Sequence, residues 1–139
     1  PLSCSKAGRP TAHPRLSEVL MLPPVTNLFQ APTVVAPAEQ LISLLQTPHL
    51  RLEQIVSHGQ PTAAGCWYDQ AAAEWVLLAR GTATLQFEAG ESLALKAGDY
   101  LLIPAHVKHR VECCSADALW LALHYGEAVA NAAIAGATP

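Results

Sequence analysis

The stretch GDYLLIPAHVKHRV, residues Gly98 to Val111, decides how this chain folds. Gly98 suits a turn that needs a positive φ angle, and a short apolar run, 100–105, follows it. Pro104 then marks a corner, and two histidines come next, at 106 and 109. Two short strands on either side of a proline corner predict an all-β domain rather than a helical one.

The same kind of short apolar run recurs along most of the chain, with turn residues between the runs. Gly90 and Gly98 lie where hairpin or corner turns are expected. Many short strands at close spacing are typical of a β-sandwich or barrel. The expected strands are 50–57, 64–69, 74–81, 82–88, 92–98, 100–105, 109–114 and 119–125.

The regions outside these runs differ in composition. Residues 1–36 are rich in proline and predict an irregular arm, and Met21, the single methionine, suggests a natural start at that position. Residues 37–126 are expected to form one domain, with a short helix from Ala38 to Gln46 closed by Pro48. No structure is assigned to the tail, residues 127–139.

Composition excludes several functions. The net charge is -3 with only 8 Lys and Arg, so neither nucleic acid nor a membrane surface is an expected partner. No apolar run approaches the roughly 20 residues that span a bilayer, and we expect a cytoplasmic protein. The four cysteines lack the paired spacing of a zinc knuckle or a disulfide framework. No nucleophile elbow and no glycine-rich phosphate loop occur.

Two charged or titratable residues lie on otherwise apolar strand faces. Strand alternation places Glu74 with Val76 and Leu78, and it places His109 with Val111. A carboxylate that points into a small barrel is costly unless it is paired, protonated or bound to a cation. We therefore expect Glu74 and His109 to share a partner.

These residues resemble the two motifs of the cupins, which are small double-stranded β-helix (jelly-roll) barrels. The second motif, G-x5-P-x-G-x2-H-x3-N, is matched by Gly98, Pro104 and His109, with His106 in place of its inner glycine and Cys113 in place of its asparagine. The first motif, G-x5-H-x-H-x3,4-E-x6-G, is matched only at its end, by Glu74 and Gly81.

The two histidines of the first motif are missing, and its variable spacing leaves two registers open. One register places Trp67 and Asp69 in the histidine positions, and the other places Tyr68 and Gln70 there. Trp67 in a ligand position favours a site without metal. Asp69 could equally turn the chain between two strands.

The resemblance implies a metal-binding cupin that holds a small polar ligand in its barrel, and possible activity as a metal-dependent enzyme. By analogy the metal ligands would be His109, Glu74 and Asp69, a set that suits Fe, Mn, Ni or Zn. It also implies a homodimer. The alternatives are a metal-free small-molecule or sugar-binding module and a structural dimerisation module. Further pocket candidates are Trp67, Tyr68, Gln70, His106 and His124.

Overall fold

The computed structural model describes residues 22–30, 38–126 and 137–138 of the chain. The chain divides into two compact units, residues 1–30 and 31–139. In the described part of the first unit, Asn27 makes a local turn: its side-chain oxygen accepts a hydrogen bond from the Phe29 amide at 2.8 Å, and its carbonyl accepts one from the Gln30 amide at 3.1 Å. The expected arm, 1–36, and tail, 127–139, lie mostly outside the described residues.

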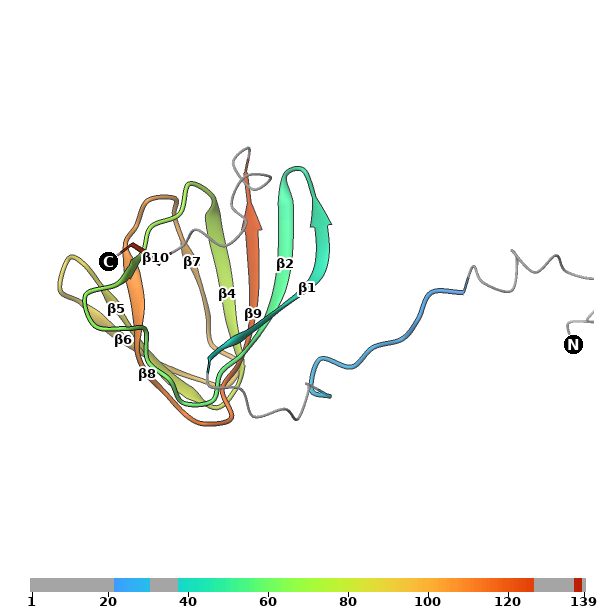
Figure 1. Ribbon diagram of the computed structural model, residues 1–139, viewed down its shortest axis with the longest axis horizontal. Coiled ribbons are helices and arrows are strands. Elements are labelled where there is room, and N and C mark those ends of the chain that lie inside the picture. The colour runs from blue at the N-terminus through green and yellow to red at the C-terminus, as the bar shows by residue number, and fades with distance from the viewer. Residues whose placement is uncertain (1–21, 31–37, 127–136, 139) are drawn as a thin grey trace, which may run out of the picture. The chain divides into compact units, whose positions relative to one another are not determined.

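The second unit contains two antiparallel five-stranded sheets that face one another (Figure 1). The first sheet has the order β1-β2-β9-β4-β7. Its strands are β1 (Gln40–Thr47), β2 (Leu50–Val56), β9 (Leu119–Tyr125), β4 (Ala73–Arg80) and β7 (Tyr100–Ile103).

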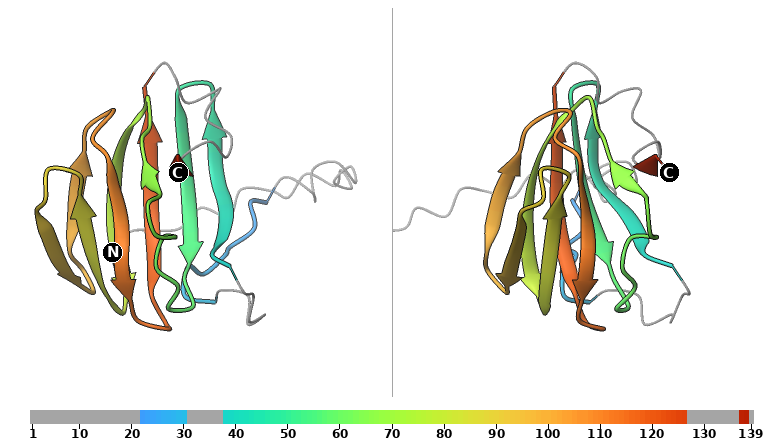
Figure 2. Two further views of the ribbon diagram at one scale, coloured as in Figure 1. Left: turned by 60° about the vertical axis from the view of Figure 1, so that its left-hand side comes forward. Right: turned by 90° about the vertical axis from the view of Figure 1, so that its left-hand side faces the viewer.

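The second sheet has the order β10-β3-β8-β5-β6. Its strands are β10 (Ala137–Thr138), β3 (Trp67–Tyr68), β8 (His109–Cys114), β5 (Thr82–Phe87) and β6 (Ser92–Lys96). Both views in Figure 2 show the two layers of this jelly roll, with β5, β6 and β8 stacked against the first sheet.

The expected all-β architecture is confirmed, and each of the eight predicted strands has a counterpart. Gly90 and Gly98 have φ angles of 98° and 95°, as their predicted turn positions require. The described residues contain no helix that is long and apolar enough to cross a membrane.

The helix expected from Ala38 to Gln46 is wrong, because residues 40–47 form strand β1. β1 pairs with β2 along its length, and the pairing shifts register between Ser43 and Leu45. This bulge interrupts the two-residue alternation, so the leucines at 41, 44 and 45 acquire a helix-like spacing. Cross-strand pairing outweighs the local pattern here.

The hydrophobic core lies between the two sheets. Its buried members come from β4, β5, β7 and β9 and from the residue before β9. Alternation along each strand sends every second side chain inward, as the burial pattern of β4 shows. The core residues are Val76, Leu78, Ala83, Leu85, Ile103, Ala118, Trp120 and Ala122.

Candidate functional site

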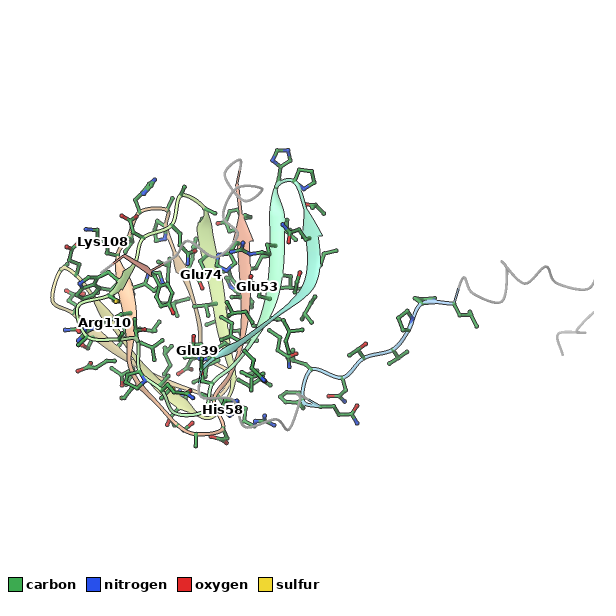
Figure 3. All side chains as sticks on the ribbon, viewed as in Figure 1. Glu39, Glu53, His58, Glu74, Lys108 and Arg110 are labelled. Carbon is green, nitrogen blue, oxygen red and sulfur yellow. The ribbon has the colours of Figure 1, made fainter. Side chains whose placement is uncertain are left out.

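Glu74 and His109 meet between the two sheets, as the sequence predicts. Glu74 lies on the inner face of β4 and His109 begins β8, so the contact joins the first sheet to the second. His109 Nε2 lies 3.3 Å from Glu74 Oε2, and the two side chains are 8% and 10% exposed. Figure 3 shows Glu74 pointing between the layers.

The geometry of this pair leaves one oxygen without a hydrogen bond. His109 Nδ1 donates to the Val107 carbonyl at 2.9 Å, which turns Nε2 toward Glu74. The contact between Nε2 and Oε2 is close enough for an ion pair, yet Glu74 Oε2 is a buried oxygen that accepts no hydrogen bond from the described residues. Buried polar atoms normally have a partner, so this oxygen is an exception among the described residues.

The electrostatics of the pair favour a charged imidazole. Burial lowers the pKa of His109, but the Glu74 carboxylate and the Val107 carbonyl together outweigh burial and raise that pKa above its ordinary value of 6.5. In a pair of this kind the carboxylate can accept a proton and the imidazolium can donate one. The pair therefore has the chemistry of both a binding site and an acid–base site.

Aromatic rings flank His109 on both sides within the second sheet. Tyr68 on β3 is its cross-strand neighbour, with ring centroids 5.6 Å apart. Phe87 on β5 is its neighbour on the other side, at 6.2 Å. Burial raises the pKa of Tyr68, and the Glu39 carboxylate raises it further, so the phenol is neutral at physiological pH.

A second polar group lies next to Glu74 in the first sheet. His124 on β9 pairs across the strands with both Glu74 and Arg51. Its Nδ1 lies 2.9 Å from Gln70 Oε1 and its Nε2 lies 3.4 Å from Glu53 Oε2. Arg51 Nε reaches the other oxygen of Glu53 at 2.8 Å.

This second group holds Glu53 in its charged form. The hydrogen bond from His124 lowers the pKa of Glu53 most, and Arg51 lowers it further, against the opposing effect of burial. Arg51 and Glu53 were not among the residues expected from the sequence. The alternation of side chains in LRLEQIV could have revealed Arg51 and Glu53. It places both residues on the same strand face as the apolar Ile55.

Asp69 and His106 form a separate pair that is more exposed. His106 Nδ1 lies 3.0 Å from Asp69 Oδ1, with side chains 70% and 30% exposed. The His106 amide donates to the Gln70 carbonyl at 2.7 Å. His106 has a φ angle of 61°, the left-handed conformation that explains why a glycine would suit this position.

The residues of the two registers left open by the sequence do not all face the Glu74–His109 pair. Tyr68 lies beside His109 and Gln70 contacts His124, so these two residues face the site. Trp67 points the other way: its ring lies 5.2 Å from the guanidinium carbon of Arg110, which is on the side of β8 opposite His109. Trp67 is therefore not a residue of the barrel interior.

The three expected metal ligands are only partly brought together. Glu74 and His109 are in contact, whereas Asp69 contacts His106. No three His, Cys, Asp or Glu side chains of the described ranges gather closely enough to hold one ion. The donor set of a three-residue metal site is thus incomplete in these residues.

Comparison with known proteins supports the same family that the motifs suggest. The family model of the cupin domain matches residues 56–124. A protein of Ralstonia eutropha JMP134, named a "putative mannose-6-phosphate isomerase", is 37% identical with a TM-score of 0.70, and the match covers 74% of this chain and 98% of that chain. No curated protein matches the chain.

Two more distant structures share the fold. A cupin superfamily protein of Desulfitobacterium hafniense DCB-2 is 16% identical, with a TM-score of 0.61 and coverage of 70% of this chain and 86% of that one. A cupin of Methanocaldococcus jannaschii with a double-stranded β-helix fold is 19% identical, with a TM-score of 0.55 and coverage of 66% and 84%. Motifs, architecture and comparisons agree, and the chain belongs to the cupin superfamily.

Proposed function

We propose that this cupin binds a small hydroxylated molecule between its two sheets, on the Glu74–His109 pair. The observation that carries the proposal is the buried Glu74 Oε2, which accepts no hydrogen bond from the described residues. A buried carboxylate oxygen without a donor costs free energy, and a ligand hydroxyl would remove that cost. The neighbouring imidazole of His109 supplies a donor to a second ligand oxygen.

The walls of the site suit a compact ligand with both polar and apolar surface. Tyr68 and Phe87 present rings on either side of His109, and apolar side chains of the core lie further along the same strands. Sugars and polyols combine hydroxyl groups with C–H surface in this way. The name of the Ralstonia protein, a sugar-phosphate isomerase, supports the same ligand class.

A divalent cation between the same two side chains is the second candidate. The tips of Glu74 and His109 lie 3.3 Å apart, and one of them is an oxygen without a hydrogen bond. These mixed oxygen and nitrogen donors suit Fe, Mn, Ni or Zn. The described residues supply no third His, Cys, Asp or Glu ligand, so we derive no chemical step through a metal.

Calorimetry with mannose 6-phosphate, mannose and mannitol tests the first proposal, using protein purified without an affinity tag. We expect saturable binding of at least one probe. Glu74→Gln should weaken it about 10- to 100-fold, because a hydrogen bond to a charged group is worth about 1.5–3 kcal/mol. Glu91→Gln, in an exposed turn, is the matched control and should bind as the parent does.

Metal analysis of the same preparations separates the two candidates. Stoichiometric metal in the parent that is lost in Glu74→Gln and His109→Gln, without unfolding, supports the cation. A metal-free parent that binds a probe supports the hydroxylated ligand. If the parent binds neither metal nor any of the three probes, both candidates fail.

A further inference from the structure

Two loops at one end of the barrel lead directly into the Glu74–His109 pair. The β3–β4 loop, residues 69–72, is followed by β4, of which Glu74 is the second residue. The β7–β8 loop, residues 104–108, is followed by β8, of which His109 is the first residue. The placement of these two loops therefore influences how the two walls of the site meet.

Each loop also supplies a partner that orients one buried histidine. In the β3–β4 loop, the side-chain oxygen Oε1 of Gln70 lies 2.9 Å from His124 Nδ1. In the β7–β8 loop, the Val107 carbonyl accepts a hydrogen bond from His109 Nδ1 at 2.9 Å. The two histidines lie on opposite sheets and are 3% and 6% exposed. A shift of either loop would therefore turn an imidazole inside the site.

His106 joins the two loops to each other. Its amide donates a hydrogen bond to the Gln70 carbonyl at 2.7 Å, and its Nδ1 lies 3.0 Å from Asp69 Oδ1. A carboxylate only accepts hydrogen bonds, so His106 Nδ1 is the donor in this second contact. We call the contact between the side chains of Asp69 and His106 the loop clamp.

The loop clamp is not explained by the stability of the fold. His106 has a φ angle of 61° and is, among the described residues, the only one besides glycines with a positive φ. A Cβ atom makes this left-handed conformation unfavourable. The side chains of His106 and Asp69 are 70% and 30% exposed, and exposed contacts of this kind add little stability. Backbone strain that stability does not explain is typical of functional sites.

We propose that the loop clamp positions the two buried histidines for the ligand, so that Asp69 and His106 are positioning residues of the site. Asp69 directly precedes Gln70, and His106 directly precedes Val107. Fixing the first two residues therefore fixes the two groups that hold the buried imidazoles. The inference rests on the proposed function, because its effect on affinity requires a ligand bound to the Glu74–His109 pair.

Calorimetry on the full chain with mannose 6-phosphate, mannose and mannitol measures the effect on affinity. His106→Gly and Asp69→Ala should each weaken the binding of a probe about 2- to 30-fold, the range for residues that act on a site without touching its ligand. His106→Gly should not lower the melting temperature, because glycine adopts the left-handed conformation without strain. Weaker binding without lost stability is a result that a merely structural role would not produce.

Asp99→Ala is the matched control, because Asp99 also makes an exposed side-chain contact, with Lys96 Nζ at 3.2 Å. The Asp99 carbonyl accepts a hydrogen bond from the amide of Leu78, a core residue, so this turn is remote from the Glu74–His109 pair. The Asp99 carboxylate also accepts a hydrogen bond from the Lys96 amide. Asp99→Ala should therefore cost more stability than Asp69→Ala and still bind the probe as the parent does.

Nuclear magnetic resonance of the histidine side chains tests the loop clamp without any ligand. In both His106→Gly and Asp69→Ala, the ring signals of His109 and His124 should move. The ring signals of His58, which follows β2 at the other end of the barrel (Figure 3), should stay in place. Signals of His109 and His124 that are unchanged in both variants overturn the proposal, whether or not a probe binds.

The binding data can overturn the proposal independently. A probe that binds both variants as tightly as it binds the parent does so, and so does an equal loss of affinity in Asp99→Ala. Weaker binding of His106→Gly that is matched by a lower melting temperature reduces the loop clamp to a structural role and also overturns the proposal. If no probe binds the parent, the proposed function fails, and the histidine signals alone decide on the loop clamp.

Discussion

The two ends of the barrel interior are built on the same strands but have opposite chemistry. At one end of the first sheet the inward residues of β2, β9 and β4 are Arg51, His124 and Glu74. Four residues further along each strand, the inward residues are apolar: Ile55, Trp120 and Leu78. Strand alternation produces both ends, so the same period of two yields a core in one place and a site in the other.

Of the two ends, the apolar end stabilises the fold. The apolar end buries side chains without polar atoms, and Leu78 is 0% exposed. The polar end keeps a carboxylate oxygen buried without a hydrogen bond, an arrangement that lowers stability. We therefore expect substitutions at the apolar end to destabilise the protein and apolar substitutions at the polar end to be tolerated.

The largest expected effect is at the apolar end. Leu78→Ala should reduce the free energy of unfolding by about 2–5 kcal/mol, because it removes buried methyl groups and leaves a cavity. Urea denaturation should show a lower midpoint with an unchanged slope. Leu93→Ala, at a position 42% exposed, should change stability by less than about 1 kcal/mol. Equal losses in the two variants would contradict the placement of the core.

A smaller effect of opposite sign is expected at the polar end. The double variant Glu74→Leu/His109→Leu should be as stable as the parent or more stable by about 1–4 kcal/mol, because apolar residues of similar volume often replace a buried ion pair without loss. Glu74→Leu alone leaves the imidazole buried without its carboxylate and should be less stable than the double variant. A double variant clearly less stable than the parent would show that the pair supports the fold.

The smallest effect concerns pH. Since the pKa of Glu53 lies below its ordinary value of 4.5, the unfolded chain binds a proton at this residue more readily than the folded protein. The contribution of Glu53 to stability is therefore present above about pH 4.5 and is lost as the pH falls through the folded pKa. The melting-temperature difference between the parent and Glu53→Gln should be full at neutral pH and shrink in acid.

Glu91→Gln, in an exposed turn, supplies the comparison for that measurement, and its melting temperature should follow the parent at every pH. A difference between the parent and Glu53→Gln that stays constant down to strongly acidic pH would remove His124 as the source of the lowered pKa.

The sequence predicts the strands in which apolar and polar residues alternate regularly. The strands of residues 50–125 and the inward positions of Glu74 and His109 follow from their apolar neighbours. Strand β1 could not be predicted in the same way, because its bulge between Ser43 and Leu45 disguises a strand as a helix. A local irregularity of one residue is enough to change the apparent period.

The site itself depends on pairing between distant strands, which no local pattern encodes. Whether Trp67 or Tyr68 faces inward depends on β3 pairing Tyr68 with His109 on β8. A shift of one residue would exchange the two faces. The same dependence explains why Asp69 was expected beside Glu74 and instead contacts His106.

The three tryptophans occupy three different surroundings, which gives the chain its own optical reporters. Trp120 is 3% exposed in the core, Trp75 lies against Tyr100 on the first sheet, and Trp67 lies under Arg110 on the second sheet. In variants that retain one tryptophan at a time, the fluorescence would therefore report separately on the core, on the first sheet and on the second sheet. Fluorescence could then show whether the two sheets and the core unfold together or one after another, without any added dye.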